Sequence, residues 1–170
     1  MQLTTLLAWF LPLLVGADAA NLAPEPVKDP MPVISALGGG SSGRAVWRID
    51  IDATGRLEAK VAGGSQPKQP VRVLTETEQS RLRLLIAALP VDGQHYSFGY
   101  WVIDASMFFT LRVGGGKTAR TYEVTEGLSE EDAVRPEVRA IVDVLNFLHG
   151  FVGSKSATPP PQLKGAGVPK

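Results

Sequence analysis

The stretch Gly114–Thr118 reads Gly-Gly-Gly-Lys-Thr and resembles the end of a phosphate-binding loop. In such a loop a further glycine stands five residues before the glycine that precedes the lysine, and the amides of the helix that follows hold the phosphate. Here that position is Leu111, and residues 119–124 have the composition of a strand. The stretch therefore predicts a hairpin turn.

A second stretch, Asp50–Gly55, resembles the first half of a calcium-binding loop, because oxygen-bearing side chains alternate before a glycine. The twelfth position of such a loop needs a bidentate glutamate, and Val61 stands there. The flanking residues also have the alternation of strands rather than of helices. We expect a solvated hairpin turn.

The two histidines, His95 and His149, lack a second potential metal ligand at helical or strand spacing. No serine stands in a Gly-x-Ser-x-Gly motif. We therefore expect no enzymatic activity, no metal and no cofactor. One alternative is an enzyme whose carboxylates converge with His95 only in the folded chain, in a pocket near the 91–99 loop that holds groups with shifted pKa values.

The composition narrows the class of partner. Cysteine is absent, which excludes disulfides and thiolate sites, and 17 basic residues balance 17 acidic ones. The basic residues are scattered rather than gathered into a stripe, so we expect no nucleic-acid partner. A protein partner is the remaining expectation.

The N-terminal segment has the features of an export signal. An apolar run, Leu6–Gly16, is too short to span a bilayer and precedes small residues at Ala17 and Ala19. We expect a signal peptide over 1–19, with an uncleaved membrane tether as the alternative, and a mature chain without a membrane span. The protein is then secreted or periplasmic.

Proline content divides the rest of the chain. Four prolines in residues 20–32 predict an extended linker, and residues 153–170, rich in proline and glycine, predict a disordered tail. A single domain is expected over 33–152. At about 120 residues, such a domain buries enough surface to fold without disulfides or a bound metal ion.

Period-two alternation predicts most of the strands. Residues 46–52 and 57–61 place apolar side chains on one face and charged ones on the other, which predicts an antiparallel hairpin. A short extended piece follows at 71–74. Three further β-rich runs are expected to form a meander over residues 100–104, 108–113 and 120–125.

Two helices are predicted from their start signals and apolar stripes. Thr75 and Glu78 match a capping box, and leucines follow at helical spacing until Pro90. Pro136 suits the first turn of a second helix that ends near Gly150. The chain is thus expected to be α+β, with an antiparallel sheet of about five to six strands packed by two helices in the order β-β-β-α-β-β-β-α.

Two segments are candidates for partner contact. The first is the glycine-rich loop 38–43, which contains Gly38, Gly39, Gly40 and Gly43 and is able to adapt to another surface. The second is an aromatic run of a composition enriched at protein interfaces. Its members are Tyr96, Phe98, Tyr100 and Trp101. The alternative is that the glycines are connectors and the aromatics are core.

The layout resembles the emfourin-type domain, a small protein inhibitor of thermolysin-like metallopeptidases. The likeness rests on the glycine-rich 38–43 stretch, a leucine-rich helix from Thr75, a meander and a last helix from Pro136, and it covers most of 33–152. The chain departs from the pattern in its apolar N-terminus and its long 62–70 connection. The resemblance implies inhibition of a metallopeptidase and carries over no inhibitory residue.

Together these features predict an exported, non-enzymatic α+β domain that binds another protein. Inhibition of a secreted metallopeptidase is the alternative within the binding class, and an enzyme with a site near residues 91–99 is the alternative outside it. A further alternative is an envelope or assembly component whose proline-rich ends act as spacers.

Overall fold

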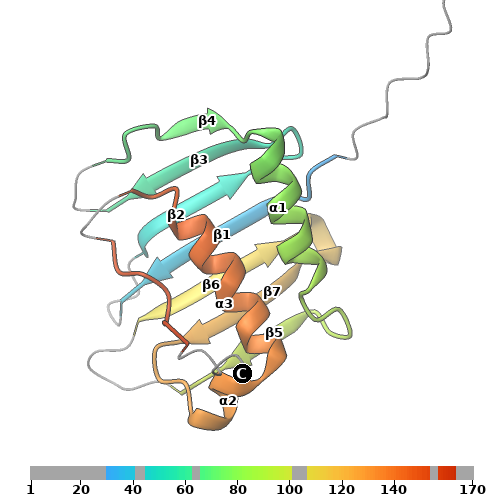
Figure 1. Cartoon of the computed structure of the whole chain (residues 1–170), viewed down its shortest axis with the longest axis vertical. Helices are drawn as coiled ribbons and strands as arrows, with labels where there is room; N and C mark the ends of the chain where they lie inside the picture. Colours follow the sequence, from blue (N-terminus) through green and yellow to red (C-terminus); the bar gives the residue numbers. More distant parts are fainter. Residues whose placement is uncertain (1–29, 41–44, 63–65, 101–106, 154–156, 164–170) are drawn as a thin grey trace, which may run out of the picture.

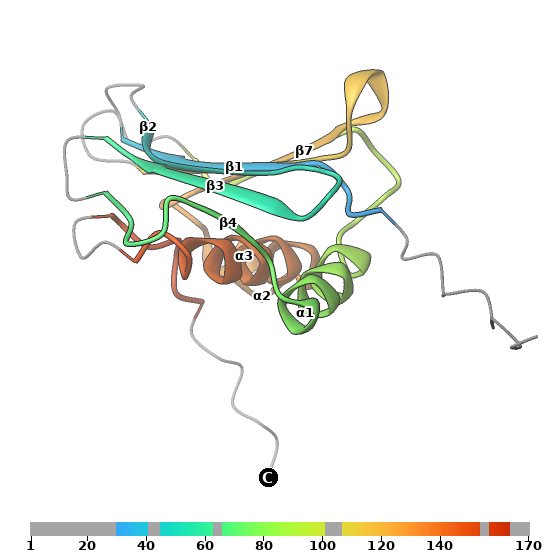
Figure 2. The same ribbon diagram turned by 90° about the horizontal axis from the view of Figure 1, so that it is seen from above.

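The computed structural model describes residues 30–40, 45–62, 66–100, 107–153 and 157–163. They form a seven-stranded sheet with its helices packed on one face, as Figures 1 and 2 show. The elements are β1 (Ile34–Gly39), β2 (Ala45–Ile51), β3 (Arg56–Val61), β4 (Val71–Val73), α1 (Glu76–Ala87), β5 (His95–Phe98), β6 (Phe108–Val113), η1 (a 3-10 turn, Gly116–Thr118), β7 (Arg120–Thr125), α2 (Glu130–Val134) and α3 (Pro136–His149).

The strand order across the sheet is β4-β3-β2-β1-β6-β7-β5. All neighbouring strands are antiparallel except β5, which runs parallel to β7. The predicted α+β class is confirmed, whereas the prediction of an antiparallel sheet with five to six strands is wrong. The chain leaves one edge of the sheet at β4, crosses its face as α1 and enters the opposite edge as β5 (Figure 1).

The strand predicted over 100–104 lies largely outside the described residues. Tyr100 forms an isolated bridge with Gly127, and the strand of this region comes earlier, at β5. The stacked rings of Tyr96 and Tyr122, 5.2 Å apart, and the buried Phe98 explain why this earlier segment joins the sheet. Pairing with β7 removes much of their apolar surface from water.

The two predicted long helices are confirmed. The side chain of Thr75 accepts a hydrogen bond from the backbone of Glu78, whose side chain bonds back to the Thr75 amide, so the capping box is complete. Pro136 occupies the first turn of α3, and Leu82 and Leu145, one from each long helix, are fully buried against the sheet. The short α2 precedes α3, and the Ser129 side chain caps its start by accepting a hydrogen bond from the Asp132 amide.

Both predicted hairpin turns are present. The Asp52 carboxylate accepts hydrogen bonds from the Thr54 amide, the Thr54 hydroxyl and the Arg56 amide, which closes the β2–β3 turn. The 114–119 segment joins β6 to antiparallel β7 through one 3-10 turn. Both motifs that resembled ion-binding loops are therefore turns between strands.

The central strand β1 contains Gly38 and Gly39, which the sequence placed in a flexible loop. Gly38 pairs with Trp47 on one side and with Phe109 on the other. A Cβ added at Gly38 would lie 2.5 Å from Nε1 of Trp47, so the indole occupies the space that a side chain would need. Gly38 is therefore a packing residue of the core.

Part of the segment predicted to be a disordered tail packs on the core. The Nε1 of Trp47 donates a hydrogen bond to the carbonyl of Thr158 (3.0 Å), and Nε2 of His149 lies 3.2 Å from the carbonyl of Ala157. Ala157 is 4% exposed, and Leu163 packs against the same core. Residues 157–163 thus cover the end of α3 and the indole edge.

Candidate functional site

The two segments predicted to contact a partner reach the same end of the sheet, the end at which β1 finishes and β6 begins, and β6 and β7 lie between them. Gly39 pairs with Phe108, and a Cβ placed on Gly40 would lie 3.7 Å from Sδ of Met107. We call this the loop end and define it by the described residues Gly40, Tyr100 and Met107. It lies at the left of the sheet in Figure 1.

Tyr100 is the residue that stands out at the loop end, because it is 60% exposed while its backbone is held by hydrogen bonds. Its amide donates to the carbonyl of Gly127 (3.1 Å), and its carbonyl accepts from the hydroxyl of Thr125 (3.2 Å). Gly99, at φ +88°, has no space for a Cβ, which would lie 2.2 Å from the Thr125 hydroxyl. These backbone contacts fix the position from which the amphipathic Tyr100 ring extends into solvent.

The structure separates the predicted site residues by accessibility. Phe98 is 8% exposed and belongs to the core, as Gly38 and Gly39 do. Tyr96 is half-buried, and its ring stacks on Tyr122 on the helix side of the sheet. Gly40 and Tyr100 are at the loop end, and Gly43 and Trp101 lie outside the described residues.

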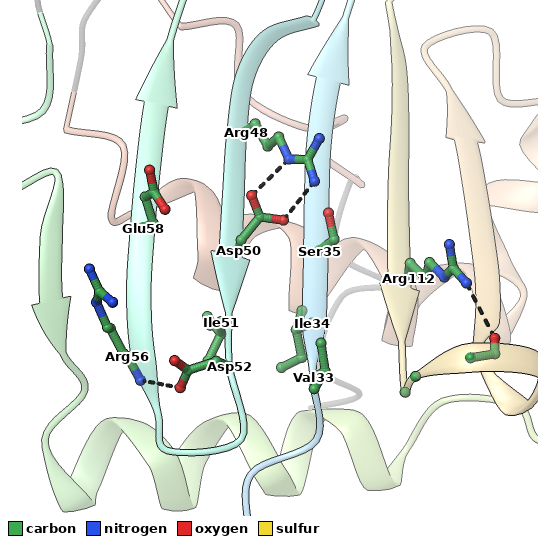
Figure 3. A pocket seen from close by; sticks show the side chains of 13 residues that line it. Val33, Ile34, Ser35, Arg48, Asp50, Ile51, Asp52, Arg56, Glu58 and Arg112 are labelled. Carbon is green, nitrogen blue, oxygen red and sulfur yellow. Dashed lines mark hydrogen bonds and ion pairs between the residues drawn. The ribbon is translucent and has the colours of Figure 1, made fainter.

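The opposite end of the sheet carries a hollow that sequence reasoning missed. It has a volume of about 390 Å3 and opens on the face that bears no helix. Figure 3 shows its floor, formed by the first residues of β1 and β3 and the last of β2 and β6. Figure 2 shows the β6–β7 turn rising from this face, away from the helices. The alternating charges along the strands could have indicated the polar floor of this hollow. Nothing in the sequence indicated that the β6–β7 turn would form its wall.

Most charges of the hollow are neutralised locally. Arg48 forms two hydrogen bonds with the Asp50 carboxylate, at 2.7 and 3.0 Å, and this contact raises the pKa of the guanidinium. The Thr54 hydroxyl holds the pKa of Asp52 below its usual value. Glu58 pairs with Lys60 at 2.8 Å. The lining carboxylates are therefore engaged with neighbours of their own.

Arg112 differs from these residues. It is exposed, and in the described part of the chain its guanidinium bonds only the carbonyl of Gly116, at 3.3 Å. Its cross-strand neighbour is Ser35, which in turn pairs with Asp50 on the next strand. The Arg112 side chain extends away from Ser35 toward the β6–β7 turn (Figure 3), and its guanidinium has no carboxylate partner among the described residues.

A second hollow of about 340 Å3 lies at residues 91–94, close to the position suggested for an enzyme site. A hydrogen bond from the Tyr96 hydroxyl lowers the pKa of Asp92, and partial burial with this bond raises the pKa of Tyr96. The lowered pKa of Asp92 and the raised pKa of Tyr96 both lie further from pH 7 than usual. Asp92 therefore stays charged and Tyr96 stays uncharged at that pH. His95 does not line this hollow and lies 3.7 Å from Glu123.

Within the ranges that the structure describes, no three potential metal ligands come together. The helices of the same residues are all too short or too polar to cross a bilayer. No family model, no curated protein and no solved structure matches this chain.

Proposed function

We propose that this protein is an exported, non-enzymatic domain that binds another protein through the loop end of its sheet. The observation that carries the proposal is the exposed ring of Tyr100 on a backbone fixed by Thr125 and Gly127. Tyrosine brings a large contact area at a low entropic cost, and prior fixing of its backbone lowers that cost further.

The convergence of the two segments supports the same surface. Gly40 and Tyr100 are 60 positions apart in the sequence, yet β1 and β5 reach the same end of the sheet, with β6 and β7 between them. Loops carried by a rigid sheet are a common location for binding residues. The seven-stranded sheet supplies that support.

The test is quantitative capture of partners by the wild-type protein, expressed from its full sequence, and by two alanine variants. Tyr100→Ala removes the proposed anchor, and Leu84→Ala removes a side chain that is 74% exposed on α1. We expect a partner that Leu84→Ala retains and Tyr100→Ala loses by about tenfold or more, the range of an interface hot spot. Equal retention by both variants contradicts the proposal.

Export is tested separately, by the intact mass of the protein recovered outside the cell. The proposal predicts a chain that begins after the apolar segment Leu6–Gly16. A product that begins at Met1, or one that stays inside the cell, contradicts export. Neither result bears on the role of Tyr100.

Inhibition of a secreted metallopeptidase is a second candidate, because a fixed surface presented at one end of a sheet suits a preorganised inhibitor. A thermolysin-like peptidase titrated with the protein then loses activity at stoichiometric concentration, and Tyr100→Ala weakens the effect. Full peptidase activity at excess protein removes this candidate and leaves the general proposal of protein binding in place.

A further inference from the structure

We propose that the surface beside the end of α3 is a binding groove for proline-rich peptide segments, and that the chain's own residues 157–163 occupy it in the structure. We call these residues the C-terminal segment. It is drawn in red in Figure 1 and runs back along α3, with Ala157 at His149 and Gln162 at Asn146. The proposal uses none of the three residues that define the loop end, so its failure leaves the proposed function untouched.

The C-terminal segment has the features of a polyproline II helix. Its three consecutive prolines, Pro159–Pro161, fix φ in the polyproline II range, and a residue that precedes a proline is held in the extended region. Such a helix repeats every three residues. Burial follows that period: Ala157 and Pro160 are buried and Leu163 packs against the core, whereas the two residues between Ala157 and Pro160 are exposed. One side of the segment therefore lies on the protein.

Two side chains of the folded domain bond consecutive carbonyls of the segment. Nε1 of Trp47 donates to the carbonyl of Thr158 (3.0 Å), and Nε2 of His149 lies 3.2 Å from the carbonyl of Ala157. A carbonyl oxygen only accepts, so this imidazole nitrogen carries the proton. The Trp47 and His149 rings pack edge to face, with centroids 5.4 Å apart. Aromatic walls with donors for free carbonyls are the usual means of recognising a polyproline II helix, which makes no internal hydrogen bonds.

Proline suits the buried position of the segment because it has no amide N–H. Pro160 is buried, and the segment pairs with no strand, so any other residue there would bring a backbone donor that needs a partner. The side-chain amide of Gln162 lies 3.4 Å from Oδ1 of Asn146 on α3. These contacts select an extended segment with proline or another apolar residue at every third position.

The groove continues beyond the contacts of the C-terminal segment. A hollow of about 240 Å3 lies between Leu163 and α3, where Val142 and Asn146 contribute to its lining. Because the segment belongs to no strand or helix, its release leaves the sheet and both long helices in place. We assign the ligand to a proline-rich segment of another protein with the same three-residue period, which competes with the chain's own segment.

The experiment is a titration of the isotope-labelled full chain with the peptide acetyl-Ala-Thr-Pro-Pro-Pro-Gln-Leu-amide. Pro160→Asp places a charge at the buried position and should release the C-terminal segment, whereas Pro159→Asp makes the same change at the exposed neighbour and should leave it docked. We expect saturable shifts of the Trp47 indole N–H and of the His149 and Asn146 amides. The peptide should bind Pro160→Asp about tenfold or more tighter than the wild type or Pro159→Asp, in which the segment competes.

A peptide variant and a second release variant complete the test. A peptide with three glycines in place of the prolines should bind about fivefold or more weakly, because it loses the preorganised backbone. Leu163→Asp, at the half-buried end of the segment, should bind the proline peptide with an affinity between those of the wild type and Pro160→Asp.

Four results would overturn the proposal. They are the absence of saturable binding to both release variants, equal binding of the proline peptide by the wild type, Pro159→Asp and Pro160→Asp, equal binding of the glycine peptide, and a wild-type dimer that dissociates on replacement of Pro160. The last result would assign the groove to the segment of a second copy.

Discussion

Replacement of Glu78 by glutamine should destabilise the protein and flatten the dependence of its stability on acid pH. The Glu78 carboxylate accepts two hydrogen bonds from Arg72, at 2.7 and 2.8 Å, and one from the Thr75 amide at 2.8 Å. These contacts, led by that of Arg72, lower the pKa of Glu78 from 4.5 to about 2. The carboxylate thus links β4 to the start of α1.

The magnitude follows from the linkage between pKa and stability. A pKa lowered from 4.5 to about 2 corresponds to at most about 3 kcal/mol of unfolding free energy. The side chains of Arg72 and Glu78 are 22% and 27% exposed, and solvent screening reduces the expected loss to about 1–2 kcal/mol in Glu78→Gln at pH 7.

The sign of the pH effect is fixed by the direction of the pKa shift. Because the folded-state pKa is lowered, the contribution is complete above 4.5 and disappears as the pH falls toward about 2. Urea unfolding of the wild type and Glu78→Gln at pH 7 and at pH values between 4.5 and 2 measures it. The two proteins should differ at pH 7 and converge at the lowest pH.

A control variant separates this contact from a general loss of charge. Asp143 is exposed in the middle of α3, and Asp143→Asn should change stability by less than about 0.5 kcal/mol. If Glu78→Gln is as stable as the wild type at pH 7, or differs from it equally at every pH, the argument from the Arg72 contact is refuted.

Three further predictions concern packing at the core and the loop end. Gly38→Ala should lower the unfolding free energy by about 1–3 kcal/mol in urea titration, because its Cβ would overlap the Trp47 indole, whereas Gly115→Ala, which meets no atom, serves as its control. Trp47→Phe removes the hydrogen bond to Thr158, so amide hydrogen exchange over 157–163 should accelerate; unchanged exchange would argue against the packed tail. Gly127→Ala places a Cβ 2.7 Å from the Tyr100 carbonyl. When the losses of partner binding and of thermal stability are both expressed as free energies, the loss of binding should be the larger.

The sequence was sufficient for elements whose signals are local. The β2–β3 hairpin follows from strict alternation around a turn that Asp52 closes with its own side chain. The start of α1 at Thr75 and that of α3 at Pro136 follow from capping and proline preferences that act within one turn. Such signals do not depend on what the element packs against.

The elements that were missed depend on distant residues. The glycines of β1 have the local preference of a loop, and their place in the sheet is set by Trp47 and Phe109 on the flanking strands. The parallel strand β5 is held by Tyr122 and Val124 of β7, which lie some 25 positions further along the chain. A single sequence does not show which strand will be the neighbour.

The candidate site shows the same division. An aromatic run with interspersed glycines led to the prediction of both Tyr100, which the structure exposes, and Phe98, which the sheet buries. The hollow around Arg112 was not predicted, because its floor draws on four strands and its wall on a turn. Only the register of the strands brings Ser35 beside Arg112.

The most direct test of the proposed function is site-specific photocrosslinking of the protein expressed from its full sequence in its native host. A photoreactive phenylalanine analogue at Tyr100 should form a crosslink to one partner protein, and the same analogue at Leu84, which is also exposed on α1, should not. A crosslinked partner that appears equally from both positions, or from Leu84 alone, would contradict binding through the loop end.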